Sequence, residues 1–165
     1  MSVVDLALRL RVATVEQLSD ALELFANRPG IRSATRAVQF ADGRAESVGE
    51  SRLRVLLAEL GFPAPIPQAE IYDTSGRLVA RVDFLLSDWG VVVEFDGAVK
   101  YGGGAPAALI AEKVREDRLR DLGYEVVRAT WPDLNHPPHL RARLDRAINR
   151  SRPSSLTGYV TTGGL

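Results

Sequence analysis

The sequence has no cysteine, only two lysines and no excess charge of either sign. Without cysteine the chain cannot form disulfides, thiolate zinc sites or a cysteine nucleophile. Its 21 Lys and Arg residues balance its 21 Asp and Glu residues, whereas a protein that coats nucleic acid usually has a basic excess. We therefore expect any contact with nucleic acid to use a local basic face.

Long apolar runs are also missing. No run reaches the roughly 18 to 20 residues that span a bilayer. The N-terminal stretch contains Asp5 and Glu16 and has no basic segment ahead of a long apolar one, so no signal peptide is predicted. The 45% of hydrophobic residues is enough for a folded core. These features predict a cytoplasmic protein without a membrane partner.

The pattern of residues divides the 165-residue chain into three parts. Residues 1–44 are predicted to be helical and too small for a large core, so we interpret them as a linker or the remnant of a larger module. Residues 45–150 are predicted to form the main domain. Residues 151–165 are polar and glycine-rich and are predicted to be largely disordered.

Two helix starts are predicted in the first part. Thr14 followed by Gln17 has the spacing of a capping box, in which each side chain bonds the other residue's backbone. Ser33 is expected to cap a second, shorter helix. The residues 27–30 between them are predicted to form a turn.

The main domain alternates helical and strand patterns. The predicted order is a helix over 48–60, strands over 68–72, 78–86 and 91–95, a helix over 107–122, a strand over 124–130 and a helix over 132–149. The last helix is expected to break near Pro137. Tight turns predict a meander of three strands, and the next helix crosses over to place the fourth strand beside them. The fold class is therefore α/β, a small mixed sheet flanked by helices.

Three carboxylates occupy informative places in these strands. Asp83 lies inside an apolar strand, and Glu94 and Asp96 end the next strand. Because side chains alternate along a strand, Glu94 and Asp96 are expected on one face, with Asp83 beside them. Converging carboxylates repel one another unless a hard cation such as Mg²⁺ binds them. Lys100 follows closely and is expected to orient water or contact phosphate.

Each acidic residue taken alone also has a structural interpretation. A buried Asp is often bonded to backbone or paired with Arg, and Asp96 before Gly97 is typical of a turn. Glu50 opens the first helix of the main domain, where an acid favours the helix dipole. Glu46 and Gln68 are weaker candidates for the same cleft. The three strand carboxylates together, with Lys100 nearby, favour a cation site.

The runs ESRLRVLLAELGFPAPIPQAEIYDTSGRLVARVDFLLSDWGVVVEFDG and EKVREDRLRDLGYEVVRATWPDL resemble an endonuclease-like domain of unknown function found in actinobacteria. That domain is related to the very-short-patch repair endonucleases of the PD-(D/E)XK nuclease superfamily. The resemblance covers about residues 46–134. It implies a restriction-endonuclease-like αβββαβ core and hydrolysis of DNA with Mg²⁺, or with Mn²⁺ in its place.

The resemblance also implies roles for particular residues. It places the metal on Asp83 and Glu94, supported by Asp96 and Glu50, and completes the catalytic set with Lys100. The superfamily usually has Lys where this chain has Asp96, and many relatives have His where it has Lys100. Asp117 and Arg118 are expected to brace the site, and Arg118 and Arg128 to contact nucleic acid.

The sequence therefore predicts a Mg²⁺-dependent DNA endonuclease. Two alternatives remain: a weak or inactive nucleic-acid-binding or regulatory module of a toxin–antitoxin or mobile-element system, and a protein-interaction domain. DNA is the expected partner, and a homodimer mate is expected as well. Longer relatives carry an N-terminal winged-helix module, so we also expect a separate DNA-targeting or toxin–antitoxin partner. His136 and His139 have the spacing of a zinc pair, but exposed loop histidines commonly bind nothing.

Overall fold

The computed structural model describes residues 1–97 and 106–162 of the chain. It divides into two compact units, Met1–Arg52 and Leu53–Leu165. The division falls inside a helix rather than after residue 44, where the sequence pattern changes. None of the helices in the described ranges combines the length and apolar character needed to cross a membrane.

The first unit consists of three short helices, as its pattern predicts. They are α1 (Ser2–Arg9), α2 (Val15–Leu24) and α3 (Ile31–Gln39). The capping box at the start of α2 is confirmed, because Gln17 N–H donates to Thr14 Oγ1 at 3.2 Å and Thr14 N–H donates to Gln17 Oε1 at 2.9 Å. The predicted cap at Ser33 is wrong. Gly30 is the N-cap of α3, with φ of 86°, and Ser33 already lies inside the helix.

The interior of the first unit is small and partly polar. Its buried residues include Val38, Ala45 and Asp5, and Asp5 is only 1% exposed. Asp5 Oδ1 accepts a hydrogen bond from Asp42 N–H at 2.9 Å, which ties α1 to the segment after α3. Large apolar side chains such as Leu24, 83% exposed, remain outside. This unit therefore buries little apolar surface, as expected from its length.

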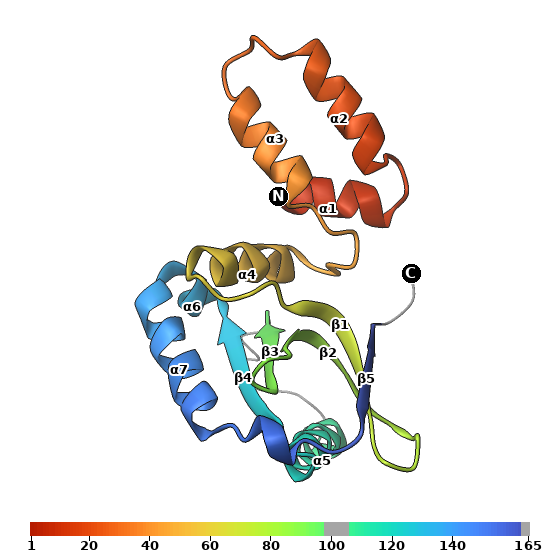
Figure 1. The fold of residues 1–165 in the computed structure, drawn as a ribbon, viewed down its shortest axis with the longest axis vertical. Helices are drawn as coiled ribbons and strands as arrows, with labels where there is room; N and C mark the ends of the chain where they lie inside the picture. The colour runs from red at the N-terminus through yellow and green to blue at the C-terminus, as the bar shows by residue number, and fades with distance from the viewer. Residues whose placement is uncertain (98–105, 163–165) are drawn as a thin grey trace. The chain divides into compact units, whose positions relative to one another are not determined.

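The second unit is an α/β domain built on a five-stranded sheet (Figure 1). Its helices are α4 (Val48–Glu59, which begins in the first unit), α5 (Pro106–Asp121), α6 (Trp131–Asn135), α7 (Pro137–Arg150) and a 3₁₀ turn (Pro153–Ser155); its strands are β1 (Ile66–Tyr72), β2 (Leu78–Leu86), β3 (Val91–Asp96), β4 (Glu125–Thr130) and β5 (Tyr159–Thr162). The strand order is β4-β3-β2-β1-β5. Strands β3 and β4 are parallel and the other pairs antiparallel. The predicted mixed sheet flanked by helices is confirmed.

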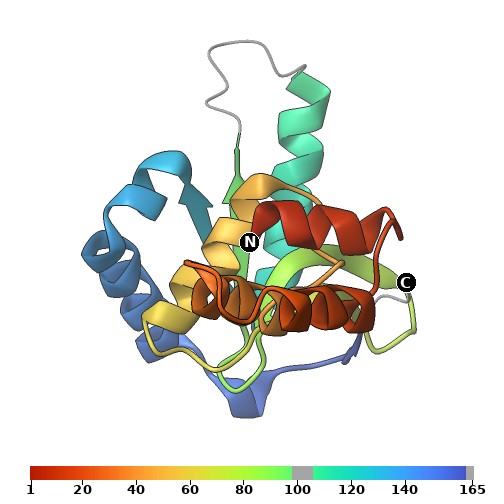
Figure 2. The ribbon, with the colours of Figure 1, turned by 90° about the horizontal axis from the view of Figure 1, so that it is seen from above.

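Apolar side chains cover both faces of this sheet. One cluster joins α4, α6 and α7 to β2, β3 and β4, with Leu57, Phe84 and Leu144 among its fully buried members. The other joins α5 to the opposite face through Leu119 and Val92. In Figure 2, β3 lies between α7 on one side and α5 on the other. Burial on both faces explains why β3 begins with three consecutive valines.

The prediction of a disordered tail is wrong for most of residues 151–165. Strand β5 pairs antiparallel with β1 and adds a fifth strand to the sheet. The rings of Tyr72 and Tyr159 stack with their centroids 5.0 Å apart, and Leu156 packs against the α5-side cluster. The tyrosine stack and the packing of Leu156 thus hold in place a segment whose polar composition suggested disorder.

The turn between β1 and β2 is organised by Asp73. Asp73 Oδ1 accepts hydrogen bonds from Ser75 Oγ at 2.6 Å, Ser75 N–H at 2.9 Å and Arg77 N–H at 3.0 Å. Gly76 has φ of 82°, a conformation that glycine adopts without strain. The bond from the Ser75 hydroxyl, followed by the backbone bond from Arg77, lowers the pKa of Asp73 from 3.8 to about 2.

A carboxyl titration by NMR is expected to give Asp73 a midpoint of about 2. A lowered pKa in the folded state stabilises the protein above the unfolded value of 3.8, and this contribution is lost as pH falls through about 2. Replacement of Ser75 with Ala should move the midpoint upward. Ser87→Ala, in the other tight turn, is the control and should leave it unchanged.

Candidate functional site

Four polar side chains lie in one row across the sheet. Glu94 on β3 is the register partner of Arg128 on β4. The β2–β3 pairs end at Phe84↔Val93, and one further step in that register sets Asp83 opposite Glu94. The β1–β2 pairs run through Pro67↔Phe84 and Ala69↔Val82, so the position skipped between them sets Gln68 opposite Asp83. The row is therefore Gln68, Asp83, Glu94 and Arg128.

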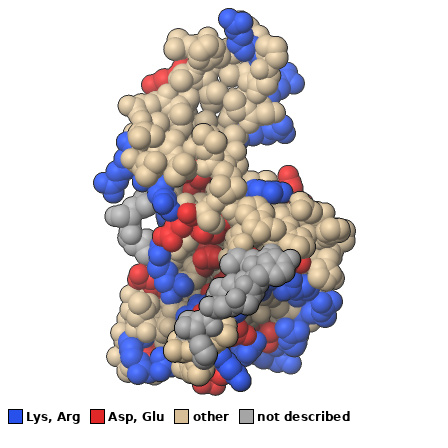
Figure 3. Space-filling view, turned by 180° about the vertical axis from the view of Figure 1, so that it is seen from behind, with Lys and Arg blue, Asp and Glu red and all other residues tan. Residues whose placement is uncertain are grey.

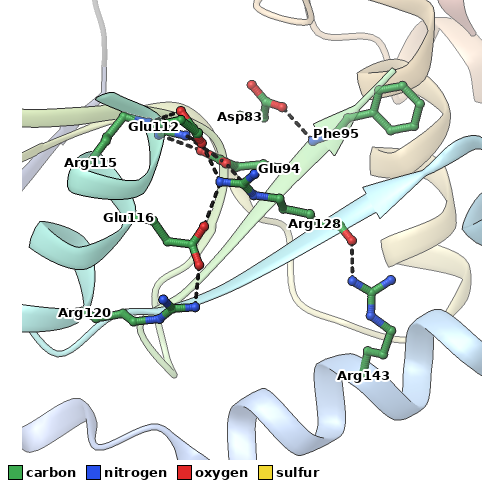
Figure 4. Close-up of polar contacts among 9 residues, drawn as sticks. All are labelled: Asp83, Glu94, Phe95, Glu112, Arg115, Glu116, Arg120, Arg128 and Arg143. Atoms are coloured by element: carbon green, nitrogen blue, oxygen red, sulfur yellow. Dashed lines mark hydrogen bonds and ion pairs between the residues drawn. The ribbon is translucent and has the colours of Figure 1, made fainter. Parts of the chain in front are cut away.

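Asp83 stands where β2 and β3 separate. Beyond Phe84↔Val93 the two strands make no further ladder pairs, although β3 continues its pairing with β4 up to Asp96. Asp83 Oδ2 instead accepts a hydrogen bond from Phe95 N–H at 2.7 Å (Figure 4). The carboxylate thus takes the place of a backbone acceptor at this fork in the sheet. This satisfies a β3 amide that would otherwise lose its ladder partner.

Gln68 has an unusual backbone conformation. Its φ is 51°, the left-handed region that residues with a side chain rarely adopt, and the residue is 5% exposed. Such a conformation costs on the order of 1 kcal/mol or more and is common where function constrains the backbone. The strained residue lies beside Asp83 in the row. The sequence marked Gln68 only as a weak candidate, because a positive φ has no signature outside Gly, Asn and Asp.

Glu94 is held by an arginine that the sequence did not single out. Arg115 on α5 donates Nη1–H to Glu94 Oε1 at 2.8 Å and Nη2–H to Oε2 at 3.0 Å, a bidentate ion pair (Figure 4). Arg115 also donates to both carboxylate oxygens of Glu112. These bonds, from Glu94 first and then Glu112, raise the pKa of Arg115 above its usual value. Arg115 is therefore held as a cation against the Glu94 carboxylate.

Arg128 belongs to the same ionic network. Its Nη2 donates to Glu112 and to Glu116, the latter at 2.7 Å, and its Nε lies 4.0 Å from Glu94 Oε2. Glu116 in turn pairs with Arg120. The network thus joins three arginines and three glutamates, of which Glu94 and Arg128 lie on the sheet and the others on α5. The charges balance, which fits the interspersed acidic and basic side chains on the face in Figure 3.

The donor chemistry of the row suits a hard divalent cation. Carboxylate and amide oxygens are the ligands that Mg²⁺ prefers. Within residues 1–97 and 106–162, however, no group of three or more Asp, Glu or His side chains is arranged to hold a metal. Asp83 bonds Phe95 N–H and Glu94 bonds Arg115, while Asp96 lies at the end of β3 opposite Thr130. A cation at Asp83 and Glu94 would compete with Arg115 for the Glu94 oxygens.

Glu50 has a local structural role. It lies in the first turn of α4 and is 7% exposed. Its backbone N–H donates to Ser47 Oγ at 3.1 Å, and its Oε2 accepts from Glu46 N–H at 2.9 Å. These bonds satisfy amides at the start of the helix, as in a capping box. The alternative interpretation, a favourable acid at the helix N-terminus, is therefore supported for Glu50.

The remaining predicted site residues have different outcomes. Lys100 lies outside the described residues. Asp117 and Arg118 are on the exposed side of α5, and Asp117 lies 3.8 Å from Arg120. The bracing role expected of them belongs instead to Glu112 and Arg115 on another face of the helix. The spacing of Glu112, Arg115 and Glu116 at i, i+3 and i+4 was the available signal, but such spacing usually marks a solvated face.

A groove of about 760 Å³ adjoins the row at the ends of β3 and β4. It is lined by Asp96, Arg128, Thr130, Pro132, Asp133, His136, His139 and Arg143. Trp131 closes on the end of β3, with its ring 5.0 Å from Phe95 and its Nε1–H bonded to Gly97 O at 3.2 Å. Trp131 therefore has a packing role. The predicted helix break near Pro137 is also confirmed, and it places both histidines on the groove.

Asp133 organises one wall of the groove. It is 5% exposed, and its Oδ2 accepts from Thr130 N–H and Oγ1–H, both at 2.9 Å, and from Arg143 Nη1–H at 3.0 Å. Its Oδ1 lies 3.1 Å from His139 Nδ1. Burial alone would raise the pKa of Asp133, but the hydrogen bonds from Thr130, His139 and Arg143 outweigh it and lower the pKa. Asp133 is therefore a charged anchor for His139 and Arg143.

Comparison with known proteins identifies two relatives. Uncharacterized proteins MT2308 and Rv2248, from two strains of Mycobacterium tuberculosis, are each 32% identical over 153 residues, which is 92% of this chain and 55% of the relative. The chain thus spans about half the length of the curated relatives it matches. No family model matches the chain, and no solved structure is similar to it. The functional argument therefore depends on the geometry of the site.

Proposed function

We propose that the second unit is a metal-dependent endonuclease that hydrolyses phosphodiester bonds of DNA. The observation that carries this proposal is the position of Asp83 and Glu94. They occupy facing positions on β2 and β3 where the two strands separate, with Gln68 and Arg128 at the ends of the same row. Both carboxylates are part-buried at this fork.

In this proposal Asp83 and Glu94 would hold Mg²⁺, with Asp96 alongside. A bound Mg²⁺ supplies an activated water and neutralises charge on the phosphate. The chain's own residues prepare the place: Phe95 N–H fixes one oxygen of Asp83, and Arg115 holds both oxygens of Glu94. Arg118, exposed on α5, and Arg128 are suited to contact the DNA backbone.

A second candidate function is a nucleic-acid-binding or regulatory module without catalysis, such as part of a toxin–antitoxin or mobile-element system. The bidentate Arg115–Glu94 pair favours it, because that pair neutralises the carboxylate that a metal would need. In this alternative the arginine–glutamate network stabilises α5 against the sheet and has no further role.

The test is cleavage of supercoiled plasmid and of single-stranded DNA by the full chain. The expected result is nicking or cutting with Mg²⁺ or Mn²⁺ and none with EDTA. DNA binding would be measured in parallel by fluorescence anisotropy in EDTA. A folded chain that binds DNA but never cuts it, with either metal, would reject the enzyme and support the second candidate.

A further inference from the structure

The chain contains two histidines, His136 and His139, and both line the groove beside the row. Each ring has its Nδ1 engaged: His136 Nδ1 lies 3.0 Å from Pro132 O, and His139 Nδ1 lies 3.1 Å from Asp133 Oδ1. A carbonyl and a carboxylate oxygen can only accept hydrogen bonds, so each Nδ1 carries the proton. Both rings are therefore left with Nε2 as the atom that can contact a ligand.

The charges around the groove make its net charge depend on these two rings. Arg128 and Arg143 contribute two positive charges, and Asp96 and Asp133 contribute two negative ones, so the lining is neutral while both histidines are neutral. Protonation of both makes the lining doubly positive. Glu112 and Glu116 on α5, which are outside this count, offset Arg128 further, so the two histidines have more weight in the charge of the groove.

The backbone around the groove offers few amide donors. Pro132 lies on its wall, and α7 begins with Pro137 and Pro138, which have no N–H group. The usual binding of an anion by free amides at a helix start is therefore weakened here. Recognition falls to the side chains of His136, His139 and Arg143.

We infer that this groove binds a backbone phosphate of the nucleic acid, next to the one at Asp83 and Glu94, through Nε2–H of protonated His136 and His139 with Arg143 behind them. Two arginines on the same wall disfavour a metal cation bound by these imidazoles. Neutralising one phosphate adds a sequence-independent contribution to affinity and positions the strand. This inference rests on the proposed function only in taking nucleic acid as the ligand.

The test measures binding rather than cleavage, so that it stands even if the chain proves inactive. In EDTA, the affinity of the full chain for a short DNA duplex is expected to be at least about tenfold higher at pH 6 than at pH 8, because with Nδ1 engaged only a protonated imidazole can donate from Nε2. The slope of log affinity against log salt should be steeper at pH 6 by about 0.9, the increment for one neutralised phosphate.

The matched variant is the double replacement His136→Gln and His139→Gln. Both side chains are exposed, so the fold should be retained, which circular dichroism would verify. The variant should bind as the wild type does at pH 8 and lose the gain at pH 6. It keeps the N-terminal amine, so any pH dependence left in it measures that group. A gain at pH 6 that persists undiminished in the variant overturns the inference.

NMR provides a readout that needs no variant. The two histidines give two imidazole Cε1–H signals, and both should shift when the DNA duplex, or inorganic phosphate, is added at pH 6 in EDTA. If DNA binds the chain and neither signal moves, the phosphate site is elsewhere and the inference is rejected. Loss of cleavage in the metal assay with these shifts intact would reject the endonuclease and leave the phosphate site standing.

Discussion

Replacing Asp83 with Asn is expected to reduce Mg²⁺-dependent DNA cleavage by at least about 100-fold. The carboxylate charge is what a divalent cation requires, and the loss of several kcal/mol of charge stabilisation corresponds to this factor at about 1.4 kcal/mol for each tenfold. The Asn oxygen can still accept the hydrogen bond that Phe95 N–H gives to Asp83. The fork of the sheet should therefore survive, and the rate alone should change.

The measurement is the initial rate of plasmid nicking under single-turnover conditions, with the melting temperature recorded for each protein. Asp88→Asn is the matched control: it removes the same charge from the exposed turn between β2 and β3, where Asp88 accepts only a long 3.4 Å contact from Ser87 Oγ. We expect the control to cut at the wild-type rate. Equal rates for Asp83→Asn and wild type would remove Asp83 from the catalytic site.

Replacing Arg115 with Met is expected to destabilise the metal-free protein by about 2 kcal/mol. This is less than the cost of breaking a fully buried ion pair, because the Arg115–Glu94 pair is only part-buried. The side chain of Glu94 is 14% exposed and would lose both of its bonds to Arg115. For a protein of this size, the melting temperature should fall by about 4 to 8 °C. Met keeps most of the apolar stem, so the loss reports mainly on the charge.

The same variant tests whether Arg115 and a cation compete for Glu94. Ligand binding to the folded state raises stability by an amount that grows with the logarithm of the affinity, so Mg²⁺ should raise the melting temperature of Arg115→Met by more than that of the wild type. Arg120→Met is the control, because Arg120 lies on the same helix and its side chain is 55% exposed. No stabilisation of either protein by Mg²⁺ would favour the non-catalytic module over the enzyme.

The order of the elements in the second unit was predictable because hydrophobic period, turns and caps agree. Strand β2 has the predicted bounds, and the alternation of apolar residues together with the Asp73 turn fixes its pairing with β1. The apolar run of residues 91–93 is typical of a strand that is covered on both faces, as β3 is in the structure. These signals are readable from the sequence because each depends only on residues within the same helical turn or the same strand.

The site was predictable only in its backbone positions. Strand alternation placed Asp83 beside Glu94 correctly, but the sequence could not show that Arg115, which is 21 residues away from Glu94, would reach its carboxylate. The pairing of Arg115 depends on how α5 rotates against the sheet. The strained φ of Gln68 likewise depends on the tertiary packing of β1, and no local propensity encodes it.

The tail escaped prediction for a related reason. Strand β5 has a polar composition, and only its partner strand β1 makes its conformation favourable. Thr161 lies 91 residues beyond Glu70, against which it pairs. Such a long-range contact has no local signature, whereas Gly158, with φ of 83°, does mark a turn just before the strand.

This late strand has a consequence for synthesis on the ribosome. The first four strands can assemble once β4 has emerged, but β1 then remains an open edge until residues 159–162 leave the exit tunnel. An open edge with unpaired amides is a template for strands of other nascent chains. The tyrosine pair at the start of β5 favours closure of this edge, because ring stacking adds to the backbone pairing of β5 with β1. On a polysome, where nascent copies of this chain lie close together, closure of the β1 edge by β5 would keep neighbouring chains apart.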